Sequence, residues 1–212
     1  MDGVIFDNDG VVVDSEQLAN RVCAEVLTDF GWPCTYEYSI EHFLGTSLAA
    51  VRDHVERLAG RGLDADFERR YHDRLFAEFD LSLSAVPGIA DALDSLDSPI
   101  CMASSGDHNR IRYALDRCGL RNWFDGHIYS AQDVARGKPE PDLFLFAAAS
   151  EGWDPARCVV IEDSPYGVQA AKSAGMAVIG FARVTPAERL SAADVVIRDM
   201  ANVVEALNSL ML

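Results

Sequence analysis

Basic residues are scarce in this sequence. Only 18 Lys and Arg stand against 34 Asp and Glu among its 212 residues, which gives a formal net charge of −16. Proteins bind nucleic acids and anionic membrane surfaces through clustered Lys and Arg. The charge therefore argues against both as partners. It also means that an anionic substrate needs a site that is locally positive.

Long apolar runs and the Cys and His clusters of zinc sites are missing as well. No apolar run approaches the ~18 residues of a membrane span, and the N-terminus lacks the basic region of a signal peptide. The five cysteines include no CxxC pair, and the five histidines show no ligand spacing. A disulfide framework and a zinc site are therefore not indicated. We expect a globular, cytoplasmic protein with reduced thiols.

The N-terminal stretch carries the first candidate site. Val4–Phe6 is a short apolar run, typical of a buried strand in a parallel sheet. Asp7 and Asp9 follow it, and Gly10 permits an unusual turn. Two carboxylates at the end of a strand can act as nucleophile and general acid/base, especially beside a divalent cation. The alternative is an Asx-rich turn without function.

Residues 15–83 show helical periodicity and no strand-like run. Apolar residues recur at every fourth position in three segments, which we interpret as three helices. Ser15 is the expected cap of the first, Ser47 opens the second, and Asp64 or Asp66 opens the third. Because this segment is inserted after the first strand, it suits a lid over a site on the sheet. The alternative is one layer of a single rigid domain.

A small polar loop, Gly45-Thr46-Ser47, lies between the first two of these predicted helices. It is a candidate for substrate contact from the lid. An ordinary helix–helix turn with Ser47 as its cap explains the loop equally well. Both interpretations stay open at this stage.

After residue 84 the pattern alternates between strand and helix, which predicts an α/β fold with a doubly wound parallel sheet. Residues 1–14 and 84–212 would form this core, and residues 15–83 the inserted helical cap. One predicted strand ends in Ser104 and Ser105, just before a helix that Asp107 caps. Hydroxyls and free backbone N–H groups at such a place can bind an anion. The alternative for Ser104 is a turn that caps the helix.

Two further strand ends carry charged residues. Lys138 lies between Gly137 and Pro139 on a stiff loop, which makes it a better phosphate ligand than a surface lysine. Glu162 and Asp163 follow another buried strand and offer the carboxylates that Mg²⁺ prefers. They could instead complement the dipole of the next helix.

The carboxyl ends of parallel strands lie at one edge of a sheet, so these residues should converge. A nucleophile, an acid/base, a hydroxyl, a fixed cation and a metal site together indicate phosphoryl transfer. At this point the sequence resembles the haloacid dehalogenase superfamily of phosphohydrolases, and within it the branch of sugar-phosphate phosphatases and β-phosphoglucomutase. The resemblance covers the whole chain. Its four motifs match Asp7-x-Asp9-Gly10, Ser104, Gly137-Lys138-Pro139 and Glu162-Asp163-Ser164.

The resemblance implies a Rossmann-like core with a small α-helical cap, and a role for each motif. Asp7 would attack phosphorus and form an aspartyl-phosphate, while Asp9 would act as acid and then base. Lys138 and Ser104, with Ser105 beside it, would hold the phosphoryl oxygens. The expected substrate is a small phosphate ester, and the expected cofactor is Mg²⁺. Its ligands would be Asp7, the backbone carbonyl of Asp9, Asp163 and, directly or through water, Glu162.

Departures from the family pattern favour a phosphatase over a mutase. The mutase branch carries a His shortly after the first motif and an Arg after Gly-x-Ser in the cap. Here residues 14–20 contain no His, and Leu48 follows Ser47. The alternatives are a β-phosphoglucomutase-like phosphosugar mutase and a non-catalytic sensor of a phosphometabolite. We expect a monomer, because the cap must move and no large apolar stripe is left over.

Overall fold

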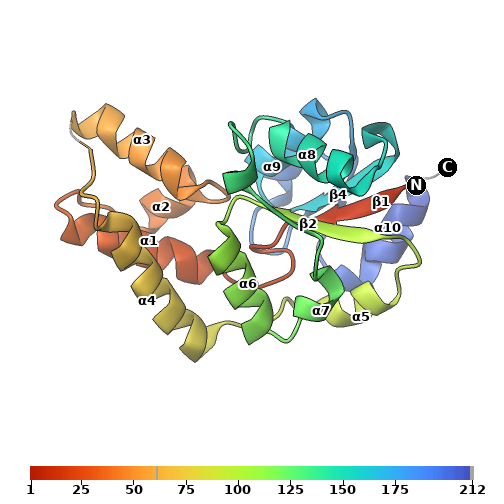
Figure 1. The fold of residues 1–212 in the computed structure, drawn as a ribbon, viewed down its shortest axis with the longest axis horizontal. Coiled ribbons are helices and arrows are strands. Elements are labelled where there is room, and N and C mark those ends of the chain that lie inside the picture. Colours follow the sequence, from red (N-terminus) through yellow and green to blue (C-terminus); the bar gives the residue numbers. More distant parts are fainter. Residues whose placement is uncertain (61, 211–212) are drawn as a thin grey trace.

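Figure 1 shows a computed structural model of the protein, which describes residues 1–60 and 62–210. Six parallel strands form one sheet in the order β3-β2-β1-β4-β5-β6. The predicted α/β fold with a doubly wound parallel sheet is confirmed. The strands are β1 Gly3–Phe6, β2 Ile100–Ser104, β3 Ile128–Ser130, β4 Cys158–Glu162, β5 Ala177–Phe181 and β6 Val195–Ile197.

The first strand occupies the centre of the sheet. Ile5 of β1 lies opposite Cys101 of β2 on one side and Val160 of β4 on the other. The chain builds outward from β1 through β2 and β3, then returns to build the other half from β4. The strand order therefore reverses next to β1, and ligands of open α/β sheets bind at the carboxyl ends of the strands at such a point.

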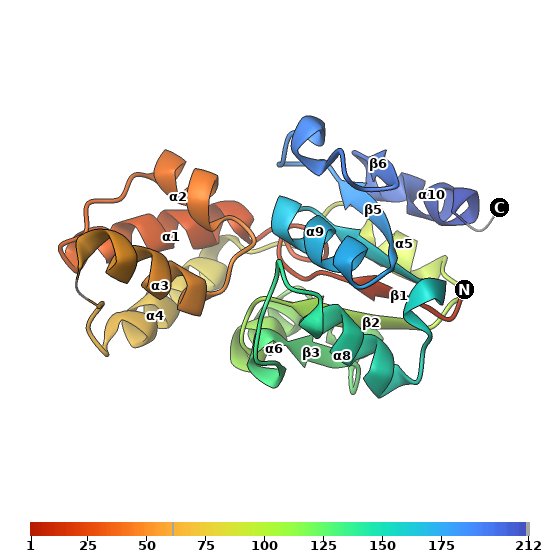
Figure 2. The same ribbon diagram turned by 90° about the horizontal axis from the view of Figure 1, so that it is seen from above.

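Helices cover both faces of the sheet (Figure 2), as the two-sided burial of its strands requires. Because strand side chains alternate, Val4 and Phe6 face one layer and Ile5 faces the other. One layer contains α5 Ile89–Asp94, α6 His108–Arg117, α7 Arg121–Phe124 and α10 Val203–Ser209; the other contains α8 Asp142–Glu151 and α9 Pro165–Ser173. Short 3-10 helices are η1 Ala131–Asp133, η2 Pro155–Arg157, η3 Ala187–Leu190 and η4 Met200–Asn202.

Four more helices form a group of their own, which we call the helical layer. They lie together at one end of the molecule, away from both termini (Figures 1 and 2). Their buried apolar side chains pack into a common core, with Val22, Phe67 and Leu75 fully or nearly buried. The helices are α1 Glu16–Asp29, α2 Tyr36–Phe43, α3 Leu48–Ala59 and α4 Phe67–Ser82.

The helical layer differs from the sequence prediction in one helix. Three helices were expected, but Tyr36–Phe43 forms an additional one, α2, which Thr35 caps by accepting a hydrogen bond from Tyr38 N. Its eight residues bury only two side chains, Ser39 and Phe43, so they carry no apolar stripe. The loop Gly45-Thr46-Ser47 consequently joins α2 to α3.

The predicted helix caps at Ser47 and Asp107 are confirmed, because their side chains accept from Ala50 N and Arg110 N. The predicted cap at Ser15 is wrong. Its backbone is helical, with φ −101° and ψ −18°, whereas a capping side chain needs an extended backbone. Its hydroxyl donates a hydrogen bond to Asp9 instead.

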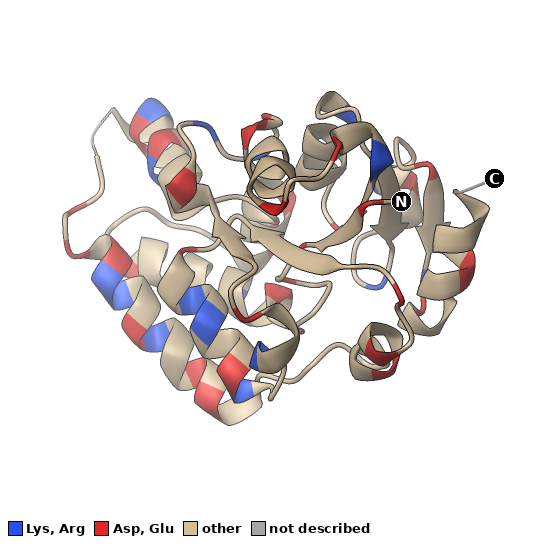
Figure 3. Cartoon of the chain, turned by 45° about the vertical axis from the view of Figure 1, so that its right-hand side comes forward, with Lys and Arg blue, Asp and Glu red and all other residues tan. Residues whose placement is uncertain are grey.

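Charged residues are largely on the outside. Acidic and basic residues alternate along α4 (Figure 3), where Arg69 pairs with Asp73 at 3.0 Å. All five cysteines are free. Across residues 1–60 and 62–210, no helix has both the length and the apolar character needed to cross a membrane.

Candidate active site

The carboxyl ends of three neighbouring strands are joined by one lysine. Lys138 is one of two lysines in the chain, and its side chain is only 1 % exposed. Its Nζ donates to Asp7 Oδ1 at 2.7 Å, to Glu162 Oε1 at 2.6 Å and to the carbonyl of Ala103 at 3.1 Å. Asp7 follows β1, Ala103 lies in β2 and Glu162 ends β4. The stiff loop thus places a cation at the point where the strand order reverses.

Burial and charge together set the protonation of this group. Burial favours the neutral amine of Lys138, but Asp7 and Glu162 outweigh it and raise its pKa above the usual value. Burial also raises the pKa of Asp7 to about 7, an effect that Lys138 opposes and Glu162 reinforces. The ammonium is therefore held charged, and it is the main protein group that favours an anionic Asp7.

Asp163 has the features of a metal ligand. Both of its carboxylate oxygens are buried and have no hydrogen-bond partner. Burial, Glu16 and Glu162 raise its pKa well above the usual value. Oxygens of Asp7, Glu162 and Asp163 lie within 4.8 Å of one another. A buried carboxylate needs a compensating charge, and a hard divalent cation between Asp7 and Asp163 would supply it.

Gly10 makes room for Asp163. Its φ is +79°, and a Cβ added there would lie 2.0 Å from Asp163 Oδ2. The glycine after the two aspartates is thus required for its missing side chain as well as for its turn.

Both carboxylate oxygens of Glu162 accept hydrogen bonds from other groups of the protein. Its Oε1 accepts from Lys138, and its Oε2 accepts from the backbone N–H of Ser164 at 2.8 Å and from the Ser164 hydroxyl at 2.9 Å. Its carboxylate therefore fixes the lysine and the start of α9, while Asp163 faces the candidate metal position with free oxygens.

Three side chains contact the carboxylate of Asp9, two residues after Asp7. Arg110 Nη2 donates to Asp9 Oδ1 at 2.6 Å, and the Ser15 hydroxyl donates to the same oxygen. Ser104 Oγ lies 3.4 Å from Asp9 Oδ2. The sequence analysis assigned no role to Arg110, because a single arginine on the first turn of a helix carries no motif.

The predicted anion-binding serines both lie at this edge. Ser104 Oγ accepts from the backbone N–H of Gly106 at 3.1 Å, so its hydroxyl is oriented by the turn. Ser105 Oγ donates to the carbonyl of Gly45 at 3.2 Å, which joins the sheet to the helical layer. A small hollow beside Asp7 and Asp9 is lined by Ser105 together with Gly45 and Thr46; the remaining lining residues are Glu16, Gly106 and Arg110.

Three polar residues of the helical layer were not singled out in the sequence. Asn20 Nδ2 donates to Glu16 Oε2 at 2.9 Å, and Ser39 Oγ donates to Asn20 Oδ1 at 2.8 Å. Burial raises the pKa of Glu16 to about 8, and the nearby Asp9 adds to the effect. Helical spacing indicates i,i+4 contact between Glu16 and Asn20, but Ser39 belongs to the helix that the sequence analysis missed.

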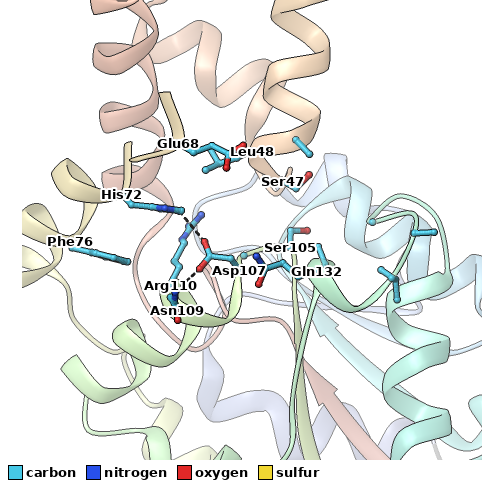
Figure 4. Close-up of a pocket in the computed structure, with 16 residues that line it drawn as sticks. Ser47, Leu48, Glu68, His72, Phe76, Ser105, Asp107, Asn109, Arg110 and Gln132 are labelled. Carbon is cyan, nitrogen blue, oxygen red and sulfur yellow. Dashed lines mark hydrogen bonds and ion pairs between the residues drawn. The ribbon is translucent and has the colours of Figure 1, made fainter. Parts of the chain in front are cut away.

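A cavity of about 530 Å³ opens between the helical layer and the sheet (Figure 4). Leu48 and Phe76 line it from the helices, and Ser105 and Gln132 from the loops after β2 and β3. Ser47 faces this cavity, whereas Gly45 and Thr46 face the hollow at Asp7. The size suits a small metabolite.

Gly45 allows the helical layer to approach the sheet. Its φ is +75°, and an added Cβ would lie 2.5 Å from Ser164 Cβ. We expect Gly45→Ala to hold the two parts apart and to lower kcat/KM about tenfold or more. Gly60→Ala is the matched control, since Gly60 has φ +66° but nothing within 4 Å. Equal losses of activity in the two variants, measured by steady-state kinetics, would contradict this role.

His72 of α4 and Asp107 join the helical layer to the sheet, with His72 Nε2 2.9 Å from Asp107 Oδ2. Burial opposes ionisation of Asp107, but hydrogen bonds from His72 and from Arg110 N outweigh it and lower its pKa to about 2. The pKa is below its unfolded value, so the stabilisation is complete above about pH 4 and is lost as the pH falls towards 2.

Asp107→Asn should therefore lower the free energy of unfolding by about 2 kcal/mol at pH 6, and by much less at pH 2.5. Asn preserves the helix cap, so the change isolates the charge. Urea unfolding at both pH values measures it. Asp199→Asn, at the exposed cap of η4, is the control. A difference that is independent of pH would exclude the ion pair as its cause.

Comparisons with known proteins identify the family and the fold. Residues 1–175 match the family of haloacid dehalogenase-like hydrolases. A 6-phosphogluconate phosphatase of Escherichia coli is 29 % identical over 182 residues, which cover 85 % of this chain and 82 % of that protein. A fructose-1-phosphate phosphatase of the same organism is 32 % identical over 180 residues, 82 % of this chain and 93 % of that protein.

Solved structures show the same fold along the full chain. A haloacid dehalogenase-like protein of Agrobacterium tumefaciens is 36 % identical, with a TM-score of 0.83 and coverage of 100 % of both chains. Asp7, Ser104 and Glu162 lie at strand ends, as predicted, whereas Lys138 lies on the loop after η1; all four stand in a fold shared with a protein of that family. This chain belongs to the haloacid dehalogenase-like hydrolases.

Proposed function

We propose that this protein is a Mg²⁺-dependent phosphatase that hydrolyses a small phosphorylated sugar or sugar acid through an aspartyl-phosphate on Asp7. The observation that supports this most is the position of Asp7. It accepts a hydrogen bond from the buried Lys138, and it lies near Asp163, whose carboxylate oxygens have no hydrogen-bond partner. A carboxylate between a fixed cation and a metal position can approach a phosphate dianion without prohibitive repulsion.

The Mg²⁺ ion would be held by Asp7 and Asp163, with the Asp9 carbonyl and Glu162 as further candidates. When bound, it would neutralise charge on the phosphoryl oxygens. The chain's own cationic contribution to the phosphoryl group is Lys138. Ser104 and Ser105 would donate hydrogen bonds to the remaining oxygens, as hydroxyls at the start of a helix do.

In the first step, a carboxylate oxygen of Asp7 forms a bond to phosphorus while the bond from phosphorus to the leaving oxygen breaks. Asp9 delivers a proton to that oxygen, so that an alcohol leaves. In the second step, Asp9 takes a proton from water, and the oxygen of that water attacks phosphorus. The acyl-phosphate bond breaks, Asp7 is restored and inorganic phosphate is released.

The helical layer would act as a cap over this site. The loop Gly45-Thr46-Ser47 contributes to both hollows, and Gly45 touches the core at Ser105 and Ser164. Closing the cap would exclude bulk water from the first step. Opening it would admit substrate and release product.

The substrate class is drawn from the relatives and the size of the cavity. The relatives named above act on 6-phosphogluconate, a sugar acid, and on fructose 1-phosphate, a neutral sugar. Both molecules fit a cavity of about 530 Å³.

The proposal is tested by phosphate release from a panel of sugar and sugar-acid phosphates. We expect release in the presence of Mg²⁺, a loss of about 10²-fold or more with a chelator, and recovery when Mg²⁺ is restored. Release that survives the chelator would overturn the metal requirement alone. Isomeric sugar phosphates formed without free phosphate would indicate a mutase, and neither product from any compound would favour a non-catalytic sensor.

A further inference from the structure

Arg110 is the basic residue on the side of the site that faces the large cavity, where the leaving portion of the substrate would lie. Among the described residues that line the 530 Å³ cavity and the hollow beside Asp7 and Asp9, it is the only Lys or Arg. It also lines a third hollow, together with Glu16 and Tyr71. In Figure 4 its side chain rises from the start of α6 towards the helical layer, beside Asp107. Its guanidinium therefore stands where the reaction centre opens into the larger cavity.

The guanidinium has bonding capacity left over. Its side chain is 11 % exposed. Nη2 donates to Asp9 at 2.6 Å, and Nη1 lies 3.5 Å from the hydroxyl of Tyr71, at the limit of a hydrogen bond. Nε is buried and has no partner. A guanidinium is a planar group with five N–H donors. With some of them unused, it can bind a carboxylate or phosphate through two hydrogen bonds.

The other charged groups around the large cavity are already paired. Glu68 accepts from Arg52 at 3.0 Å, and Asp107 pairs with His72. Lys138 is bound to Asp7 and Glu162 on the phosphoryl side. Of these groups, Arg110 alone combines a positive charge, an unpartnered buried donor and a place on the cavity wall.

Its present partner is the proposed acid/base. Asp9 Oδ1 accepts hydrogen bonds from both Arg110 and Ser15, so this oxygen is already occupied. For Oδ1 to protonate a leaving oxygen, it has to exchange that ion pair for a contact with substrate. A second anionic group on the substrate could take its place on Arg110, since one carboxylate already fits there.

We propose that Arg110 binds a second anionic group on the leaving portion of the substrate, a carboxylate or a second phosphate, and that this exchange releases Asp9 for catalysis. The inference rests on the proposed phosphatase function and narrows its substrate class to acidic sugar phosphates. It makes Arg110 a determinant of specificity. A neutral substrate leaves Asp9 bound to Arg110 and is turned over slowly.

Two matched pairs of substrates test the proposal. In 6-phosphogluconate and glucitol 6-phosphate, the same six-carbon chain ends in a carboxylate or in CH₂OH. Fructose 1,6-bisphosphate and fructose 6-phosphate differ by a second phosphate. For one of these pairs we expect wild-type kcat/KM to favour the acidic member by about 30-fold or more. The pair with the larger ratio identifies the anionic group.

Arg110→Met should bring that ratio to near 1, because it removes the partner of the anionic group and lowers kcat/KM for the acidic member, and because it frees Asp9 and raises kcat/KM for the neutral member. Arg110→Lys, which keeps the charge but not the fork, should give an intermediate ratio. Arg112→Met, an exposed arginine on the same helix, is the matched control and should keep the wild-type ratio. A wild-type ratio near 1 for both pairs, or a ratio that Arg110→Met leaves unchanged, would overturn the inference while phosphate release still supports the phosphatase.

Binding provides a readout that does not depend on turnover. Calorimetry measures the affinity of both members of each substrate pair for the Asp7→Asn variant. The same measurement is made with the double variant Asp7→Asn, Arg110→Met. Preference for the acidic member that requires Arg110 supports the proposal even if no phosphate is released. Equal affinity for both members, or no binding of either, contradicts it.

Discussion

Asp7→Asn is expected to lower phosphate release by at least about 10³-fold, because the amide cannot act as the attacking carboxylate. The substitution preserves size and removes one negative charge beside Lys138, which keeps its ion pair with Glu162 at 2.6 Å. The fold should therefore survive. Initial rates with saturating Mg²⁺ measure the loss, and thermal unfolding checks the fold.

A covalent readout separates a nucleophile from a residue that only positions other groups. Wild-type protein quenched in acid during turnover should carry a phosphoryl group on the peptide that contains Asp7, detected by mass spectrometry. Asp7→Asn should carry none. Asp2→Asn, a change of an aspartate near the start of the same strand, is a control that should retain both activity and label. A phosphoryl group on Asp9, or full activity of Asp7→Asn, would refute the assignment of the nucleophile.

Lys138→Met is expected to impair both stability and activity. The change leaves Asp7 and Glu162 as two buried carboxylates without their shared cation. Removing one partner of a buried ion pair costs about 3–5 kcal/mol, which urea unfolding would show. The pKa of Asp7, already raised to about 7 by burial, would rise further without the ammonium. In the metal-free protein, more of the nucleophile would then be protonated at neutral pH.

A double variant separates the two effects. Lys138→Met with Glu162→Gln leaves only one of the two buried carboxylates charged, so it should recover much of the lost stability while activity stays low. Lys172→Met is the matched control, because that lysine is 40 % exposed and pairs with Asp194 at the surface. We expect a change of less than about 1 kcal/mol there. A stable and active Lys138→Met protein would show that the lysine is dispensable for both.

Strand ends were the part of the site that the sequence could predict. Short apolar runs followed by Asp7, Ser104 and Glu162 indicate buried parallel strands that end in polar groups. The direction of parallel strands brings these ends to one edge. The structure places all three together with Lys138, which donates to Asp7 and Glu162. Strand direction explains why Asp7, Ser104 and Glu162 meet. Lys138 lies on the loop after η1, well beyond the end of β3, so the fold of that loop and not the strand itself brings it there.

Arg110 and its contact with Asp9 were beyond prediction. The two residues are separated by 101 positions, and Arg110 is one of sixteen arginines in the chain. Its helical position predicts only a place on the first turn of α6. Ser15 was misassigned for a related reason, since a serine before a helix ordinarily caps it, whereas here its hydroxyl is used by Asp9.

By itself, then, the sequence determined the sheet, the insertion of the helices after β1, and the residues at the strand ends. These follow from periodicity and chain direction, which are local properties. The tertiary structure decided how the helical layer meets the sheet: Gly45 against Ser164, His72 against Asp107, and Arg110 against Asp9. Such contacts depend on how separate elements dock, and docking is set by the packing of whole surfaces, which no short stretch of sequence encodes.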